Sequence, residues 1–487
     1  MTLKEIAKNI HCEIIGNEET EITGITDIAE NVQEGNMFVA IRGMHTDGHT
    51  FIPQAIERGA SVVVAEKPLP GVKAVQVVVQ NTRKAVADFA AAFFGHPAKK
   101  LKMIGVTGTN GKTTTTHMIN HILNKNGIKC GLIGTSGCFW DGKQINYGMT
   151  TPDPIDLQKT LHFMLQDGVK AVAMEVSAHA LDLEKTSSIK FDVAVFTNLT
   201  RDHLDYFKTM ENYKMAKQKL FCRSSCKTAI ICTDDQAGKE LASLVKTKVI
   251  CYGKSRTGCQ IIRNKNLNNG QEFIMCDNGN VAQFFVPMLG EYNAKNALAA
   301  VLACREVGVE FENSKLSLQS LSPVLGRFET FSMQEGGLII MDYAHSPDGL
   351  ENLLNAAREI ADERGGRLIS LFGCGGNRDK GKRPQMGKIS EKLADFTIVT
   401  SDNPRYENPE EIISEIENGM MPFSHTKVTD RTAAISLGVR LLGQNDVLVV
   451  AGKGNENYLD INGVKIPYSD TNAINQAIIA SENQGQK

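Results

Sequence analysis

The chain of 487 residues lacks the features of a membrane, secreted or nucleic-acid-binding protein. Apolar runs such as residues 446–452 (DVLVVAG) are far shorter than the ~20 residues of a membrane span, and residues 1–10 (MTLKEIAKNI) contain no signal-peptide core. Lys and Arg number 53 against 55 Asp and Glu, so a net charge of −2 provides no basic field for nucleic acid. These absences predict a cytoplasmic protein with no membrane and no nucleic-acid partner.

Cysteine is present but not in a pattern that would cross-link or bind zinc. Eleven cysteines are scattered along a chain without an export signal, so we expect reduced thiols and no disulfide framework. The one local group is Cys222, Cys226 and Cys232, which has neither paired CxxC spacing nor a nearby histidine. A zinc site is therefore not expected there.

Length and patterning predict three α/β domains, since one domain usually takes ~100–200 residues. Residues 1–98 alternate helical patterns with β-branched runs, which indicates a small α/β N-terminal domain. Residues 99–326 repeat strand, glycine-rich turn and helix, as in a parallel sheet buried on both faces. Residues 327–487 repeat apolar strands that each run into a polar, glycine-rich loop, which predicts a Rossmann-like C-terminal domain.

The clearest chemical signal is residues 102–115 (KMIGVTGTNGKTTT), an apolar strand, a glycine turn and the start of a helix. Its backbone N–H groups would cradle phosphates, Lys112 would neutralise them, and the Thr113 hydroxyl would bind Mg²⁺. Val106 stands where the strict Walker pattern has glycine, so a plain strand-to-helix turn is the alternative. The Gly-Lys-Thr ending favours a P-loop ATPase domain.

A series of further motifs follows the order typical of the Mur ligase family, which the chain resembles over nearly its whole length. They are TTPDP (150–154), MEVSAHAL (174–181), FTNLTRDHLDYF (196–207), YKMAKQKLF (213–221), GEYNAKNALAA (290–300), GRFE (326–329), DYAHSPDGLENLL (342–354), GCGGNRDKGKRPQMG (373–387), SDNPRYENP (401–409) and AGKGNE (451–456). The resemblance implies an ATP- and Mg²⁺-dependent ligase that forms an amide bond.

The resemblance implies an ATP site around the P-loop that is completed by the third domain. Its residues would be Gly108, Thr109, Asn110, Gly111, Lys112, Thr113, Thr114, Asn296, Arg327 and Asp342. Without the family, the last three would be interpreted as a capping asparagine and an exposed ion pair. Closure of the third domain onto the second would complete the site.

The resemblance also implies a metal site. Its ligands would be Thr113, Glu175, His203 and Lys217, with Lys217 modified by CO₂ to a carbamate (N6-carboxylysine), because an unmodified lysine cannot hold Mg²⁺. Lys112, His203 and Lys217 would be the catalytic residues. Alone, His203 is typical of a hydrogen-bonded structural residue and Lys217 of a solvated charge.

The amino-acid substrate would be held by a set of residues in the third domain. By resemblance these are Arg378, Asp402, Asn403, Arg405, Gly452 and Glu456. The arginine of Asn-Pro-Arg is a forked donor suited to a second carboxylate, which meso-diaminopimelate has and L-lysine lacks. The alternatives are a turn with a surface arginine, and L-lysine as the added amino acid.

On the acceptor side the chain departs from the family pattern. Thr150, Thr151, Ser177 and Lys185 stand at positions that bind the UDP-linked substrate, but Lys185 replaces an arginine and Leu183 a glutamine. On the amine side Asn455 replaces a histidine, whereas on the acceptor side the family's Asp-Ser-Arg is replaced by residues 28–30 (IAE). Several coincident losses of this kind indicate a divergent copy or a changed carboxylate acceptor.

The resemblance implies addition of an amino acid, expected to be meso-diaminopimelate, to the D-glutamate γ-carboxylate of UDP-N-acetylmuramoyl-L-alanyl-D-glutamate through an acyl phosphate, in peptidoglycan biosynthesis. The enzymatic alternatives are a different carboxylate acceptor, another Mur step and a folylpolyglutamate synthase. A nucleotide-binding regulatory paralogue is the alternative without ligase activity. The partners would be small molecules only, and the protein a monomer.

Overall fold

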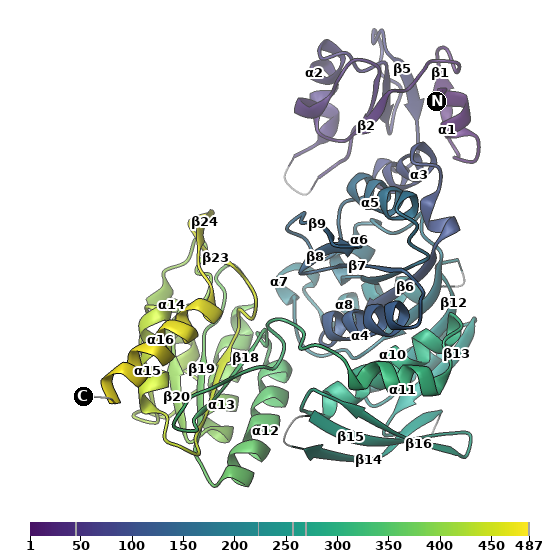
Figure 1. The fold of residues 1–487 in the computed structure, drawn as a ribbon. Helices are drawn as coiled ribbons and strands as arrows, with labels where there is room; N and C mark the ends of the chain where they lie inside the picture. The colour runs from purple at the N-terminus through teal and green to yellow at the C-terminus, as the bar shows by residue number, and fades with distance from the viewer. Residues whose placement is uncertain (44–45, 223, 256–257, 268–269, 486–487) are drawn as a thin grey trace.

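A computed structural model describes residues 1–43, 46–222, 224–255, 258–267 and 270–485, which form three sheet-containing parts (Figure 1). The N-terminal part lies at one end of the molecule, and the C-terminal part lies beside the central one (Figure 1). Among these described residues, no helix has the length and apolar character needed to cross a membrane. The expected α/β class with three parts is confirmed. The boundaries after residues 98 and 326 stay predictions.

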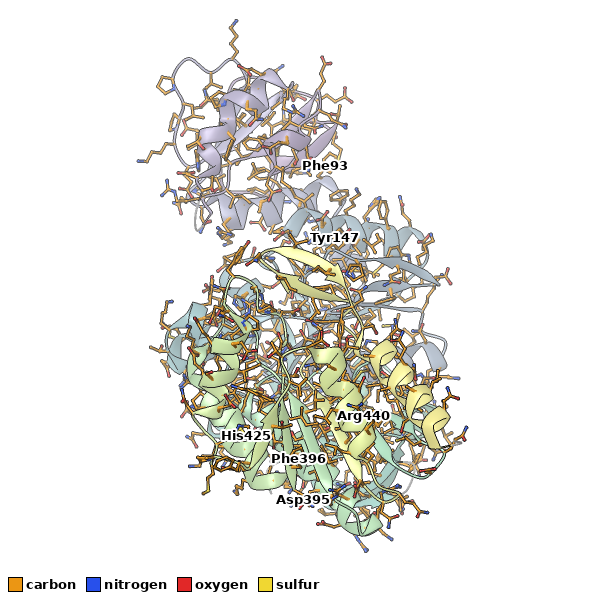
Figure 2. The ribbon with its side chains drawn as sticks, turned by 90° about the vertical axis from the view of Figure 1, so that its left-hand side faces the viewer. Phe93, Tyr147, Asp395, Phe396, His425 and Arg440 are labelled. Carbon is orange, nitrogen blue, oxygen red and sulfur yellow. The ribbon has the colours of Figure 1, made fainter. Side chains whose placement is uncertain are left out.

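The N-terminal part is a five-stranded sheet of order β1-β5-β4-β3-β2, parallel except for β1. Its strands are β1 (Glu13–Ile15), β2 (Gly24–Thr26), β3 (Asn36–Val39), β4 (Val62–Ala65) and β5 (Val75–Val78), and its helices α1 (Leu3–Ala7), α2 (Ile52–Glu57) and α3 (Thr82–Phe93). The valines of β4 are buried on both faces because α1 and α3 cover one face and α2 the other. Helix α3 also packs on α5 (Pro154–Gln166) of the central part, and Figure 2 labels Phe93 at this junction.

The central part is an eleven-stranded sheet of order β16-β15-β14-β13-β12-β11-β6-β10-β7-β8-β9. Its strands are β6 (Lys102–Thr107), β7 (Cys130–Gly134), β8 (Gly137–Trp140), β9 (Lys143–Ile145), β10 (Ala171–Glu175), β11 (Phe191–Phe196), β12 (Cys226–Cys232), β13 (Lys248–Gly253), β14 (Cys259–Leu267), β15 (Gly270–Asp277) and β16 (Asn280–Val286). Strand β6 lies between β10 and β11 in parallel register, so the chain leaves it at the middle of the sheet.

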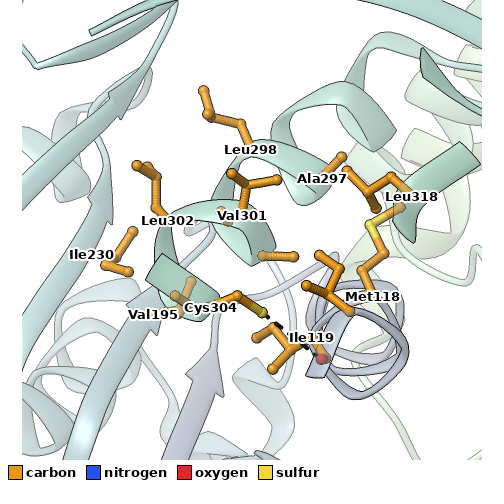
Figure 3. Packing of buried hydrophobic residues seen from close by; sticks show 14 of the residues in the cluster. Met118, Ile119, Val195, Ile230, Ala297, Leu298, Val301, Leu302, Cys304 and Leu318 are labelled. Atoms are coloured by element: carbon orange, nitrogen blue, oxygen red, sulfur yellow. Dashed lines mark hydrogen bonds between the residues drawn. The ribbon is translucent and has the colours of Figure 1, made fainter. Parts of the chain in front are cut away.

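The helices of the central part are α4 (Lys112–Lys125), α5 (Pro154–Gln166), α6 (Ala178–Asp182), α7 (Leu204–Phe207), α8 (Met210–Gln218), α9 (Gln236–Leu244), α10 (Glu291–Glu306) and α11 (Phe311–Gln319). Met118 and Ile119 of α4 pack against α10, whose Cys304 thiol donates to the Ile119 carbonyl (Figure 3). This packing fixes the helix that begins at the P-loop.

The sheet differs from the expected repeat of parallel strands at both edges. Strands β8 and β9 continue β7 as an antiparallel meander, and β14, β15 and β16 form a second one. Strands β14, β15 and β16 mix buried residues with exposed or partly exposed ones, whereas the central parallel strands are buried almost throughout, because one face of an antiparallel edge can stay in contact with solvent. The parallel core is nevertheless as expected.

The C-terminal part is a six-stranded sheet of order β17-β18-β22-β19-β20-β21, parallel except for β17. Its strands are β17 (Glu329–Ser332), β18 (Leu338–Asp342), β19 (Leu368–Phe372), β20 (Phe396–Val399), β21 (His425–Lys427) and β22 (Val447–Ala451), and β23 (Tyr458–Ile461) and β24 (Val464–Pro467) form a separate hairpin. The helices are α12 (Pro347–Arg364), α13 (Arg383–Leu393), α14 (Pro409–Glu417), α15 (Arg431–Leu441) and α16 (Asp470–Gly485). The carboxyl ends of β18, β19, β20 and β22 share one edge of the sheet.

Candidate active site

The turn between β6 and α4 is shaped as a phosphate cradle. Gly108 has φ +154°, and a Cβ there would collide with the Thr197 hydroxyl, so only glycine fits. The turn is held by Asn198, whose backbone carbonyl accepts the Thr109 N–H at 3.0 Å and whose Oδ1 accepts the Asn110 N–H at 2.9 Å. The loop is therefore fixed before any ligand binds.

Two lysines converge on this turn. Lys112 Nζ donates to the carbonyls of Gly108 and Thr109 at 2.9 and 2.7 Å, and Lys217 Nζ donates to the same Gly108 carbonyl at 2.8 Å. Burial lowers the pKa of Lys112, and burial together with the Lys112 charge holds the pKa of Lys217 well below its usual range. Lys217 is thus a buried amine and not the solvated charge that its helix suggested.

Glu175, the last residue of β10, is 1% exposed and is held by Thr135. The Thr135 N–H and hydroxyl donate to its two carboxylate oxygens at 2.9 and 3.2 Å. Thr135 comes directly after β7, which neighbours β10, so its position at the same sheet edge was the signal that sequence reasoning missed. Thr151 donates to the Glu175 carbonyl at 2.9 Å and accepts the Ser177 N–H at 3.1 Å.

His203 follows β11 and has a left-handed backbone, with φ 56°. Its N–H donates to the Asp202 carboxylate at 2.9 Å. Burial lowers the pKa of His203 to about 3, against the opposing effect of Asp202, so the imidazole is neutral at pH 7. A neutral ring nitrogen is available for a metal ion or a hydrogen bond.

A cleft of about 680 Å³ joins these groups to the C-terminal part. Its lining includes most of the expected ATP, metal and acceptor residues: Thr109, Asn110, Gly111, Lys112, Thr113, Thr114, Thr150, Thr151, Glu175, Ser177, Lys185, His203, Lys217, Asn296, Arg327 and Asp342. The Gly108 carbonyl accepts hydrogen bonds from Lys112 and Lys217, which line this cleft. Thr109 and Arg378, 269 positions apart in the sequence, are thus brought to one site.

The C-terminal part reaches the P-loop directly. Arg327 donates to the Thr113 hydroxyl at 2.9 Å and lies over the Tyr343 ring, 4.5 Å from its centroid. Asp342 is buried and accepts the N–H groups of Phe328 and Ala344 at 2.8 Å each. Arg327 and Asp342 are therefore not the exposed ion pair of the alternative interpretation.

The expected amino-acid residues are split between two places. Asp402 and Arg405 line a second cleft of about 650 Å³, bordered by hairpin β23–β24, whereas Arg378 lines the first cleft. Arg405 donates to the Gly376 carbonyl at 2.8 Å. Gly452 lies against Asp402, where an added Cβ would be 2.7 Å from a carboxylate oxygen.

Asn403 and Glu456 are held by a buried lysine that sequence reasoning missed. Lys453 Nζ donates to Asn403 Oδ1 and to a Glu456 carboxylate oxygen, each at 3.0 Å. Burial acts to raise the pKa of Asp402, but the Lys453 and Arg431 charges outweigh it and lower that pKa. Lys453 lies inside the AGKGNE motif, which was the available signal.

The acceptor-side positions that depart from the family pattern, Lys185 and residues 28–30, lie in two different environments. Lys185 forms an ion pair with Asp153 at 2.7 Å, and its side chain is only 12% exposed. Ile28 is half exposed on the loop that precedes the short 3₁₀ turn Ala29–Asn31, and neither it nor Glu30 is among the residues of the two clefts. Lys185 therefore joins the first cleft, and residues 28–30 do not.

Family comparisons match this architecture part by part. The Mur ligase family, catalytic domain matches residues 21–94, the Mur ligase middle domain residues 106–304, and the Mur ligase, glutamate ligase domain residues 326–454. A protein of Clostridium acetobutylicum is 41% identical over 98% of this chain and 99% of its own. The chain belongs to the Mur ligase family.

Two of the similar proteins and one solved structure bear the same ligase name. The Clostridium acetobutylicum protein is named UDP-N-acetylmuramoyl-L-alanyl-D-glutamate–2,6-diaminopimelate ligase 1. A Phocaeicola vulgatus protein with the same ligase name, without the final number, is 42% identical over 99% of this chain and all of its own. A solved structure of a ligase of this name has a TM-score of 0.71 at 29% identity and covers 99% of both chains. A structure of MurF from Acinetobacter baumannii, with a TM-score of 0.67 at 18% identity over 99% of this chain and 98% of its own, shares the fold.

Proposed function

We propose that this Mur ligase joins meso-2,6-diaminopimelate to the D-glutamate γ-carboxylate of UDP-N-acetylmuramoyl-L-alanyl-D-glutamate, with ATP converted to ADP and phosphate. The observation that carries the proposal is the meeting of Lys112, Lys217 and Glu175 with Arg327 and Asp342 of the C-terminal part in one cleft. Full-length relatives at about 40% identity bear the name of this activity.

The first step is phosphoryl transfer. An oxygen of the substrate γ-carboxylate attacks the γ-phosphorus of ATP, the bond to the β,γ-bridging oxygen breaks, and ADP leaves with an acyl phosphate formed. The N–H groups of residues 111–114, at the start of α4, bind the phosphate oxygens, and Lys112 neutralises the charge that develops on them. Arg327, held by Thr113, adds a second cation from the other part.

The residues around the P-loop fit Mg²⁺, which takes oxygen ligands. Thr113, Glu175 and His203 would hold it together with substrate oxygens. An unmodified Lys217 ammonium does not fit, but its lowered pKa leaves an amine that can react with CO₂, and the resulting carbamate supplies oxygen ligands. When bound, Mg²⁺ neutralises phosphate charge during the transfer.

The second step forms the amide. The amine of the incoming amino acid attacks the acyl carbon, loses a proton, and phosphate leaves from the tetrahedral intermediate. Arg405 at the rim of the second cleft faces the distal end of the amino acid and binds its second carboxylate. Asp402, Asn403, Gly452 and Glu456 surround the amine end, and Arg378 stands at the first cleft, where the two substrates meet.

The setting inferred from these substrates is the cytoplasm, where ATP and reduced thiols are found, and the protein acts there as a monomer in peptidoglycan biosynthesis. Its partners are the UDP-muramoyl peptide, the amino acid, ATP and Mg²⁺, with no nucleic acid and no membrane. Lys185 takes the place of the arginine on the acceptor side and keeps a cation in the first cleft.

The test is release of phosphate from Mg-ATP with UDP-N-acetylmuramoyl-L-alanyl-D-glutamate and with meso-diaminopimelate, L-lysine or no amine. We expect turnover that depends on diaminopimelate and a product one diaminopimelate residue heavier by mass spectrometry. Turnover with L-lysine but not with meso-diaminopimelate would identify L-lysine as the amino acid that the enzyme adds. No turnover with any amine would assign a different carboxylate acceptor.

A further inference from the structure

Residues 201–205 of the central part face residues 378–382 of the C-terminal part with complementary charges. Arg201 donates from Nε and an Nη to the two Asp379 oxygens at 3.0 and 3.2 Å. Asp202 lies 3.9 Å from Lys382 Nζ, and Asp205 lies 3.8 Å from an Nη of Arg378. Three ion pairs therefore join two short segments of different parts, one with its cation in the central part and two with their cations in the C-terminal part.

Two of the three ion pairs contain buried side chains, although Arg201 and Arg378 are 40% and 49% exposed. The side chains of Asp202, Asp379 and Lys382 are at most 8% exposed. Gly381 has no side chain, and a Cβ there would lie 2.6 Å from an Nη of Arg201, so glycine allows the guanidinium to seat. Pairs with buried members and two-point Arg–carboxylate geometry are the ones that hold an interface.

His203 lies at the centre of the first segment. Its backbone lies in the left-handed region, with φ 56°, which is uncommon for residues other than glycine. The carboxylate that accepts its N–H is Asp202, and the same carboxylate faces His345 at 3.6 Å and Lys382 at 3.9 Å from the C-terminal part. Lys382 in turn donates to the His345 carbonyl at 2.7 Å, so both groups are fixed to each other.

We propose that residues 201–205 and 378–382 form an interdomain latch whose docking sets the position of His203 at the phosphate site. Lys382, Arg201 and Asp379 are positioning residues outside the lining of the first cleft, and they act on His203 through Asp202. The latch rests on the proposed function in one respect, since the same loop carries Arg378 toward the first cleft. The contact that brings the loop with Arg378 to the first cleft therefore also fixes His203 at the phosphoryl-transfer site.

The test is a charge-reversal cycle with Arg201→Asp, Asp379→Arg and the double variant. Lys388→Glu, an exposed lysine of α13, introduces the same change of charge as Arg201→Asp and is the matched control. Three readouts are compared with wild type: kcat and KM for ligation, Mn²⁺ affinity in the presence of ADP by electron paramagnetic resonance, and the radius of gyration by small-angle X-ray scattering.

Each single reversal is expected to lower kcat by about tenfold, to weaken Mn²⁺ binding by a similar factor and to enlarge the molecule, because a pair becomes a repulsion. The double variant should recover to within about threefold of wild type, and Lys388→Glu should match wild type. A double variant no better than its worse parent would overturn the latch. If the radius of gyration increases but Mn²⁺ affinity and kcat do not change, the contact only packs the two domains together. That result would overturn the positioning role.

Scattering and Mn²⁺ binding do not require turnover, so they separate the latch from the proposed reaction. If the wild-type protein is inactive but each single reversal still increases the radius of gyration and weakens Mn²⁺ binding, the proposed reaction is refuted. The latch is then still supported. An active wild-type enzyme whose reversals change none of the three readouts would refute the latch and leave the reaction standing.

Discussion

The side-chain nitrogens of Lys112 and Lys217 share one acceptor, the carbonyl oxygen of Gly108, at 2.9 and 2.8 Å. Two buried amines at one carbonyl repel each other when both are charged, because burial reduces the screening of their charges. Conversion of Lys217 to a carbamate replaces this repulsion by an attraction to Lys112. The arrangement thus favours opposite roles for the two lysines, one cationic at the phosphates and one modified at the metal.

Replacement of Lys112 should remove charge stabilisation during phosphoryl transfer. Lys112→Met is expected to lower kcat by about 100- to 1,000-fold, the usual effect of losing one such group. The measurement is steady-state phosphate release with saturating substrates. Lys125→Met, at the exposed end of the same helix, should retain wild-type kcat. Equal losses in both variants would show that α4 and not the Lys112 charge is responsible.

Replacement of Lys217 should remove a metal ligand and be repairable by added carboxylate. Lys217→Ala is expected to lose at least about 100-fold in kcat and to regain part of it with formate or acetate, which can occupy the vacated space. Lys214→Ala, one turn earlier on α8 and paired with Glu211 and Glu240, is the control and should stay active. A Lys217→Ala enzyme with full activity would refute the carbamate.

Arg405 should determine which amino acid is added. Arg405→Ala removes a donor for the second carboxylate, so the ratio of kcat/KM for meso-diaminopimelate over L-lysine should fall by about 30- to 100-fold. Arg440→Ala, on the exposed side of α15, should leave that ratio unchanged. The ratio is measured by competition of the two amines with product analysis by mass spectrometry. An unaltered ratio in Arg405→Ala would contradict the carboxylate contact.

His117 on α4 should make folding stability depend on pH. Burial, with a smaller contribution from Arg327, lowers its pKa from 6.5 to about 4. Between these values the unfolded chain binds a proton that the folded protein does not, so the free energy of unfolding should rise as pH increases from 4 to 6.5. Urea midpoints at pH 5 and pH 7 should therefore differ less in His117→Gln than in wild type. An identical difference in both proteins would contradict the lowered pKa.

The parallel core and the P-loop could be predicted because their signals are local. Apolar strands followed by Gly108, Gly111 and Lys112 specify a strand, a turn and a helix start within 14 residues, and the structure confirms that order. The buried lysine at 217 is different: its helix alone indicates a solvated charge, and only the family resemblance placed it at the phosphates. Local sequence patterns thus predicted the strand, turn and helix of the P-loop, and the family resemblance predicted which other residues belong to the site.

Features that depend on contacts between distant segments were not predictable from the sequence. Arg201 and Asp379 are 178 positions apart, and neither position has a local pattern that signals a partner. Arg378 was grouped with Asp402 by motif, yet the fold directs it to the other cleft. The antiparallel strands β14, β15 and β16 were also missed, because a half-exposed edge lacks the continuous apolar run that marks a buried strand.

The most direct test of the central claim is transfer of oxygen from the acceptor to phosphate. The γ-carboxylate of UDP-N-acetylmuramoyl-L-alanyl-D-glutamate is labelled with ¹⁸O, and the phosphate released in the presence of Mg-ATP and meso-diaminopimelate is analysed by mass spectrometry. An acyl phosphate predicts one ¹⁸O atom in each phosphate and an equal amount of amide product. Unlabelled phosphate, or label recovered in AMP, would contradict γ-phosphoryl activation of this carboxylate.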